Sequence, residues 1–132
     1  MEGQCQCGSV RFTTPTPKPL KMYFCHCLEC RRQSASAFGI SAIFPAFEIP
    51  STVTDIGVYT HSNTTSGREK KCYFCKKCGT RVMHGGKDYV AVKGGCLDAL
   101  DKDLLDSATH IWTKRAIVPI PDGVESYPEE PP

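Results

Sequence analysis

Seven of the nine cysteines in this sequence of 132 residues fall into three clusters whose spacing suits metal binding. The clusters are Cys5 and Cys7 before Gly8, then Cys25, Cys27 and Cys30, then Cys75 and Cys78 before Gly79. In the C-x-x-C-G pattern of the third cluster, two thiolates on a tight turn can meet one tetrahedral zinc ion at about 2.3 Å, and the glycine tolerates the unusual φ of the turn. The clusters therefore predict zinc as the bound ion.

Cys72 and Cys96 lie outside these clusters. The total of nine cysteines is odd, which argues against a disulfide framework. The amino-terminal stretch MEGQCQCGSV has neither the basic start nor the apolar run of a secretion signal. In a reducing compartment, clustered cysteines are more often metal ligands than cross-links. We therefore expect a cytoplasmic protein with reduced thiols.

The spacing leaves two pairings open for a four-cysteine site. The C-x-x-C pair at 75–78 could share one ion either with the pair at 5–7 or with the pair at 27–30. On an extended chain, residues two apart point to the same face, so the pair at 5–7 reaches one ion only if the backbone bends. Gly8 is placed to allow that bend, but the spacing alone does not decide between the pairings.

The elements that must position these cysteines are short. Runs of alternating apolar and polar residues, rich in β-branched and aromatic side chains, predict strands, and clusters of Gly, Pro, Ser and Asn predict the turns between them. The predicted strands lie at 9–13, 22–24, 37–44, 52–60, 70–74, 80–84, 89–93 and 110–113, with turns that include 14–19, 49–52, 61–67, 85–86 and 94–95. Two short helices are expected, at 28–34 and 99–107. The pattern predicts a mainly β, antiparallel domain.

Residues 118–132 differ in composition from the rest, being rich in proline and acidic side chains. Such a segment cannot bury enough apolar surface to form a core of its own. We expect a single domain over residues 1–117, followed by a carboxyl-terminal segment, 118–132, that is either an extended strap or a partly disordered tail.

Charge and length exclude several classes of protein. The chain has 16 Lys and Arg against 14 Asp and Glu, and the two signs alternate along it, so no strong field attracts it to nucleic acid or anionic lipid. No segment approaches the roughly 18 apolar residues of a membrane span. We expect neither a nucleic-acid partner nor a membrane, and the sequence leaves the oligomeric state open.

Five segments, in order, resemble the family of glutathione-dependent formaldehyde-activating enzymes, which also includes the domain of centromere protein V. They are CQCGSVRF, CHCLECRRQSASAFG, YFCKKCGTRV, GGCLD and HIW, between about residue 3 and about residue 113. The resemblance implies a β-tent fold, in which several short antiparallel sheets and few short helices bind zinc. It also implies two zinc ions per chain, a structural ion on Cys5, Cys7, Cys75 and Cys78 and a catalytic ion on Cys25, Cys27 and Cys30.

A catalytic role for Cys25, Cys27 and Cys30 agrees with their number, because catalytic zinc keeps one coordination position for water or substrate. Three thiolates around Zn²⁺ leave a net charge of −1, so the ion polarises water poorly and favours a soft thiol, bound as a thiolate. The resemblance therefore implies a zinc-dependent carbon–sulfur lyase. Its substrates would be adducts of glutathione, or a similar small-molecule thiol, with a carbonyl or another electrophilic carbon.

A fourth protein ligand would turn this second site into an inert structural one. The candidates are Cys72, Cys96, His84 and His110, and Cys96 stands where the family commonly has a small residue such as threonine. In that case the alternative is a non-enzymatic, zinc-stabilised β module that binds a protein partner.

Other side chains near the second cluster have expected places. His26 should point away from the metal and form a local hydrogen bond, and Trp112 should pack in the core. Arg31, Arg32 and Gln33 follow the cluster closely, and they could either receive the carboxylates of a glutathione-like ligand or lie on the solvated surface.

Overall fold

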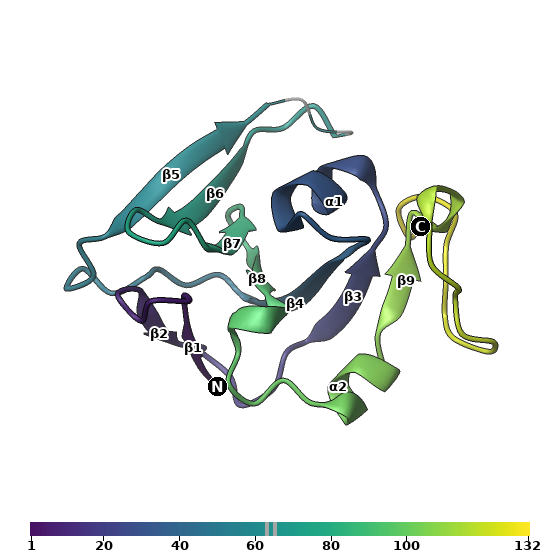
Figure 1. Cartoon of the computed structure of the whole chain (residues 1–132), viewed down its shortest axis with the longest axis horizontal. Helices are drawn as coiled ribbons and strands as arrows, with labels where there is room; N and C mark the ends of the chain where they lie inside the picture. Colours follow the sequence, from purple (N-terminus) through teal and green to yellow (C-terminus); the bar gives the residue numbers. More distant parts are fainter. Residues whose placement is uncertain (63, 65) are drawn as a thin grey trace.

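The computed structural model describes residues 1–62, 64 and 66–132 as a mainly β domain with few short helices (Figure 1), so the predicted fold class is confirmed. The strands are β1 (Glu2–Gln4), β2 (Arg11–Thr13), β3 (Lys21–Cys25), β4 (Gly39–Pro45), β5 (Ile56–His61), β6 (Lys70–Cys75), β7 (Arg81–Gly85), β8 (Tyr89–Lys93) and β9 (Thr109–Ile111). The helices are α1 (Leu28–Ser34) and α2 (Lys102–Asp106), with the 3-10 turns η1 (Gly94–Cys96) and η2 (Thr113–Arg115).

The two predicted helices are confirmed, and each has a visible start signal. The Cys27 side chain caps α1 by accepting from the Cys30 N–H, and the Asp101 side chain caps α2 by accepting from the Leu104 N–H at 2.9 Å. The second helix is shorter than the predicted 99–107. In the described part of the chain, no helix has both the length and the apolar character needed to cross a bilayer.

All eight predicted strands are found, with ends shifted by a few residues, and they occupy two sheets. Seven strands form one sheet in the order β5-β6-β7-β8-β4-β3-β9, and β1 pairs with β2 in a second, two-stranded sheet. Every pair is antiparallel except β3 with β9, which is parallel. The expectation of purely antiparallel pairing is corrected here, because side-chain alternation specifies faces but not strand direction.

The structure has one strand more than the sequence pattern predicts, and that strand is β1. It has only three residues, of which only Gly3 is buried, so it shows too little alternation to be recognised. Gly3 pairs with Phe12, and a Cβ on Gly3 would stand 2.4 Å from the Phe12 ring, so glycine is required there. The predicted turn at 61–67 includes residues 63 and 65, which lie outside the described residues.

The central strands separate a packed face from an open one. Met22, Ala42, Phe44 and Val92 are buried on one face in the main hydrophobic core. Their neighbours along the strands point to the opposite face, where the helix α1 and the second cysteine cluster lie. The alternation along β3, β4 and β8 thus places chemistry on one side of the sheet and the core on the other.

Residues 118–132 run back along β9 as an extended strap (Figure 1). His110 of β9 donates its N–H to the Glu125 carbonyl at 3.0 Å and accepts from the Tyr127 N–H at 2.9 Å. The Glu125 carboxylate is also held by Lys21 Nζ at 2.7 Å and by the Thr109 hydroxyl at 2.6 Å. Of the two expected forms of this segment, the structure has the strap.

Candidate metal centres and active site

The sulfur atoms of Cys5, Cys7, Cys75 and Cys78 lie within 4.8 Å of one another. The Cys7 sulfur is 3.7 Å from both the Cys5 and the Cys75 sulfur. Four sulfurs around one ion at 2.3 Å would be about 3.8 Å apart, so the donor set and its spacing fit tetrahedral zinc. Of the two pairings that the spacing left open, the structure brings the pair at 5–7 to the pair at 75–78.

Two glycine turns bend the backbone at this four-cysteine cluster. Gly8 has φ of 79° and Gly79 has φ of 83°, in the left-handed region that glycine adopts without strain. In the second turn, the Cys75 sulfur accepts the N–H groups of Lys77 and Cys78 at 3.3 and 3.5 Å. Such donors stabilise a thiolate, as a zinc ligand requires.

The sulfur atoms of Cys25, Cys27 and Cys30 form a second group, also within 4.8 Å of one another. Cys25 ends β3, Cys27 caps α1, and Cys30 lies in the first turn of α1, so a strand end and a helix start bring them together. Among the described residues, no other histidine, cysteine or carboxylate joins this three-cysteine cluster. The chemistry of the three donors fits zinc with one position left for another ligand.

The side chains of the three-cysteine cluster are closely packed. Cys25 and Cys30 are buried, Cys27 is half-buried, and a Cβ on Gly39 would stand 3.1 Å from Cys30 Cβ. The Cys27 sulfur accepts the Cys30 N–H at 3.3 Å, and Gln33 Nε2 lies 3.6 Å from the Cys30 sulfur. Hydrogen bonds from the Cys25 and Cys30 thiols lower the pKa of Cys27, and the bond to Cys27 raises the pKa of Cys25. Cys27 is therefore the first of the three to ionise.

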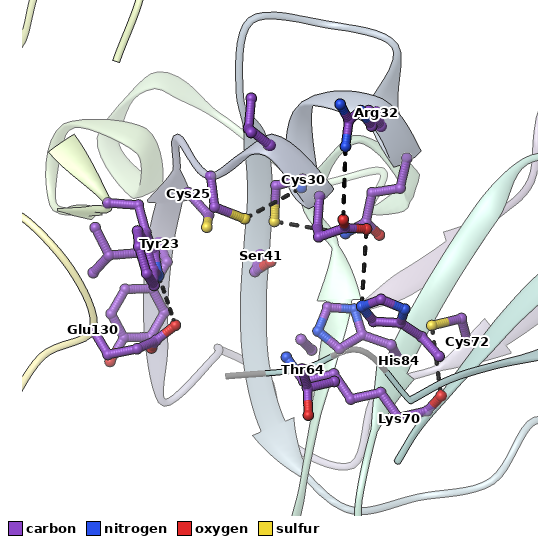
Figure 2. A pocket seen from close by; sticks show the side chains of 18 of the residues that line it. Tyr23, Cys25, Cys30, Arg32, Ser41, Thr64, Lys70, Cys72, His84 and Glu130 are labelled. Carbon is purple, nitrogen blue, oxygen red and sulfur yellow. Dashed lines mark hydrogen bonds and ion pairs between the residues drawn. The ribbon is translucent and has the colours of Figure 1, made fainter. Parts of the chain in front are cut away.

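None of the four candidates for a fourth ligand, Cys72, Cys96, His84 and His110, belongs to the three-cysteine cluster. The Cys96 thiol lies 3.7 Å from the Arg81 carbonyl and, with Cys5 and Cys78, lines a different cavity. Cys72 is buried, as expected, and Figure 2 shows Cys72 and His84 across the cavity from Cys25 and Cys30. Burial lowers the pKa of His84 to about 3.

His26 is fully buried and forms a hydrogen bond, but the predicted local partner is wrong, because the sheet pairs β3 with the distant strand β9. Its Nε2 lies 2.9 Å from Nδ1 of His110, and the His110 ring stacks on Phe24 with centroids 4.6 Å apart. Desolvation by burial lowers the pKa of both histidines. This pair supports the strand end behind the cysteines and is outside both sulfur groups.

A cavity of about 910 Å³ opens beside the three-cysteine cluster (Figure 2). This volume is at the upper end of the roughly 300–1,000 Å³ typical of small-molecule sites. Its lining includes four cationic side chains and two acidic ones, which are Arg32, Lys70, Arg81, Arg115, Glu29 and Glu130. The excess of cations suits a ligand that carries carboxylates.

Sequence reasoning found only part of this cavity. Arg32 and Gln33 line the cavity, as expected if they meet the carboxylates of a ligand. Arg31 does not line it. Trp112 packs against the small cluster of Cys25, Cys30 and Ile111 and also lines the cavity, where its Nε1 donates to Glu130 at 2.8 Å.

Arg81, Arg115 and the strap residue Glu130 reach the cavity from distant parts of the chain. No local pattern in the sequence marked these three residues, since their neighbours in the sequence carry no motif that points to the three-cysteine cluster.

Comparisons with known proteins agree with this geometry. A crystal structure of a Rhodobacter sphaeroides protein from a structural genomics programme superposes with a TM-score of 0.60, at 20% identity, over 83% of this chain and 99% of that one. At that identity the likeness supports the fold. The family model described as glutathione-dependent formaldehyde-activating enzyme matches residues 1–115, which hold both cysteine clusters. With most of the chain matched, and the cysteines of that stretch gathered into two sulfur groups, this protein belongs to the family of glutathione-dependent formaldehyde-activating enzymes.

Proposed function

We propose that this protein is a zinc-dependent carbon–sulfur lyase that acts on adducts of glutathione, or a similar thiol, with a carbonyl or another electrophilic carbon. The proposal rests on three thiols beside a cavity of about 910 Å³, with no fourth protein ligand among the described residues. A site with three protein ligands and an adjoining cavity is the arrangement expected of catalytic zinc.

Two ions have different roles in this proposal. Cys5, Cys7, Cys75 and Cys78 would hold a structural zinc, and Cys25, Cys27 and Cys30 would hold a catalytic one. The chemistry that zinc supplies at the three-cysteine cluster, when bound, is stabilisation of a fourth thiolate, because a soft donor suits an ion that already carries three.

The cavity walls would select the substrate. Arg32 and Arg115 present guanidinium groups, which match carboxylates with two parallel hydrogen bonds, and Lys70 adds a point charge. Glutathione has two carboxylates, one ammonium group and one thiol, and the lining also has two acidic side chains that could meet the ammonium, Glu29, now 3.9 Å from Arg32, and Glu130, which accepts from Trp112 Nε1. A small anionic peptide thiol therefore fits the charges of the lining.

The reaction balances without a redox partner. The thiol sulfur forms a bond to the carbonyl carbon, the carbonyl π electrons move to oxygen, and the oxygen takes the proton that the thiol gave up. The reverse reaction breaks the same carbon–sulfur bond. Holding sulfur and carbon together in the cavity converts a bimolecular step into an effectively unimolecular one.

We assign the catalytic domain to residues 1–117 and treat residues 118–132 as an appended strap. All nine cysteines are free thiols, which motivates our proposal of a cytoplasmic location, where thiols stay reduced.

The test is thiol binding by the reduced, zinc-loaded protein, measured by titration calorimetry. Reduced glutathione should bind, and S-methylated glutathione, whose sulfur cannot ionise, should bind much more weakly. Carbon-13 exchange spectroscopy with an aldehyde should then show faster formation and loss of the thiol adduct. Equal affinity for both ligands would mean that peptide contacts dominate. If neither ligand binds, the enzyme proposal fails and the zinc-stabilised, protein-binding module replaces it.

A further inference from the structure

One cationic side chain on the face of the three-cysteine cluster has an enclosed ammonium group with no partner in the described part of the chain. Lys93 ends β8, and its Nζ is enclosed and has no hydrogen-bond acceptor among the described residues. No carboxylate of the described chain forms an ion pair with it. Burying an ammonium group without an opposite charge costs several kcal/mol, so its place requires an explanation.

The register of the sheet places Lys93 on the same face as the cysteines. Lys93 is directly opposite Ser41, and Ser41 is opposite Tyr23, which is two residues before Cys25. Paired residues on neighbouring strands point to the same face, as do residues two apart on one strand. Ser41 lines the cavity of the three-cysteine cluster together with Cys25 and Cys30 (Figure 2).

Gln33 gives a second link between Lys93 and the cluster. Its Nε2 lies within hydrogen-bond reach of the Cys30 sulfur, and its Oε1 is buried without a donor. Gln33 and Lys93 both line a second cavity of about 720 Å³, and Gln33 lines the substrate cavity as well. Gln33 therefore contacts the Cys30 sulfur and also borders the cavity that Lys93 lines.

The charges near Lys93 indicate what compensates it. Desolvation lowers the pKa of Lys93, and the Cys30 thiolate opposes that shift more than any other nearby anion. Arg81, a like charge, lowers it further. The anions available to Lys93 are therefore thiolates, and three thiolates with Zn²⁺ carry a net charge of −1.

We propose that Lys93 is the counter-cation of the three-cysteine centre and favours its metal-loaded form. With Lys93 included, the loaded centre is neutral before substrate arrives, so a fourth thiolate adds to a neutral rather than a negative site. This inference rests on the proposed function, and it makes Lys93 a positioning residue that acts through the cysteines.

The test is a metal titration of Lys93→Met, which keeps an unbranched side chain, one atom shorter, and removes its charge. Cobalt(II) replaces zinc as the probe because cobalt–thiolate absorption reports each site during competition with a chelator. Lys93→Met should weaken the weaker site about tenfold or more, equivalent to at least about 1.4 kcal/mol, and leave the tighter site unchanged. Lys93→Arg should retain most of the affinity, and Lys87→Met, an exposed lysine, should behave as wild type.

A second measurement is the melting temperature of the metal-free protein, which Lys93→Met should raise rather than lower. Metal-free Lys93→Met should melt at a higher temperature than metal-free wild type, because the uncompensated buried charge is gone. Unchanged affinity at the weaker site, equal loss at both sites, or a variant that fails to fold would each overturn the inference. A wild type that binds only one ion would instead count against the proposed function, so the two failures are distinguishable.

Discussion

The two cysteine clusters use the same donor atom and differ in what they connect. The four-cysteine cluster joins turns that are 68 residues apart, at Cys7 and Cys75, and its ligand set is complete. The three-cysteine cluster takes all its ligands from within six residues and adjoins a cavity of about 910 Å³. The first can close a long loop, whereas the second closes almost none, so a zinc ion at the first would contribute far more to folding than one at the second.

The groups that surround the two clusters also differ, in their charge. Around the four-cysteine cluster, the donors to sulfur are mainly backbone N–H groups and the Thr80 hydroxyl, which are uncharged. Around the three-cysteine cluster lie the buried Lys93 and the cationic lining of the cavity. Neutral donors suit a permanent clamp, and charges suit a site whose own charge changes when a ligand arrives.

The largest difference is expected from removing one ligand of the four-cysteine cluster. Cys78→Ser should abolish the fold or lower the melting temperature severely, because structural zinc contributes about 10–16 kcal/mol to small zinc domains. Circular dichroism and zinc content check this outcome. Cys96→Ala is the matched control, a buried cysteine outside either group, and should destabilise the fold much less.

Cys27→Ser should leave the domain folded and remove one zinc ion together with thiol binding. Serine is a good N-cap, so its hydroxyl can replace the sulfur that caps α1, and the melting temperature should fall by only a few degrees. Cys72→Ala, which changes the opposite side of the cavity, should keep both ions. If Cys27→Ser and Cys78→Ser unfold the protein equally, the two clusters do not differ and the second is structural.

A smaller effect is expected from substituting Gly39, which packs against Cys30 of the three-cysteine cluster. Gly39→Ala would place a methyl group 3.1 Å from Cys30 Cβ, and crowding of this kind costs about 1–3 kcal/mol. We expect weaker metal binding at the three-cysteine cluster and unchanged binding at the other, measured by the same cobalt titration. Gly86→Ala has no neighbour within 4 Å and serves as the control. Equal weakening of both sites would show that the effect is global.

The smallest effect concerns the strap, which packs beside the three-cysteine cluster alone. The hydrogen bond from Lys21, then those from Thr109 and Tyr127, lower the pKa of Glu125 to about 2 from its usual 4.5. Because the folded pKa is the lower one, the stabilisation is complete above about pH 4.5 and is lost as pH falls toward 2. Trp112 is the sole tryptophan, and its fluorescence should report loosening of the strap in this range.

Glu125→Gln separates this step from acid release of the metal. The variant should show looser packing of Trp112 already at pH 7 and no further strap transition between about pH 4.5 and 2. A transition of unchanged size in the variant would mean that another group controls the strap.

The sequence by itself was enough for most features that depend on residues close together along the chain, although it missed the short strand β1 and made α2 too long. The eight other strands followed from the alternation of apolar and polar residues, and the grouping of Cys25, Cys27 and Cys30 followed from a spacing that a strand end and one helical turn can bring together. The glycine turns at Gly8 and Gly79 were readable for the same reason, since a tight turn needs a φ that other residues rarely adopt.

Tertiary structure alone decided what distant segments bring together. Only the packing of β1 and β2 beside the 75–79 turn selected the partners of Cys75 and Cys78, and only the pairing of β8 with β4 placed Lys93 opposite Ser41, on the face of the three-cysteine cluster. The parallel pairing of β9 likewise carries the strap, with Glu130, to the cavity. Side-chain periodicity fixes which face a residue occupies, but strand order and direction fix which residues share that face, and these depend on contacts across the whole chain.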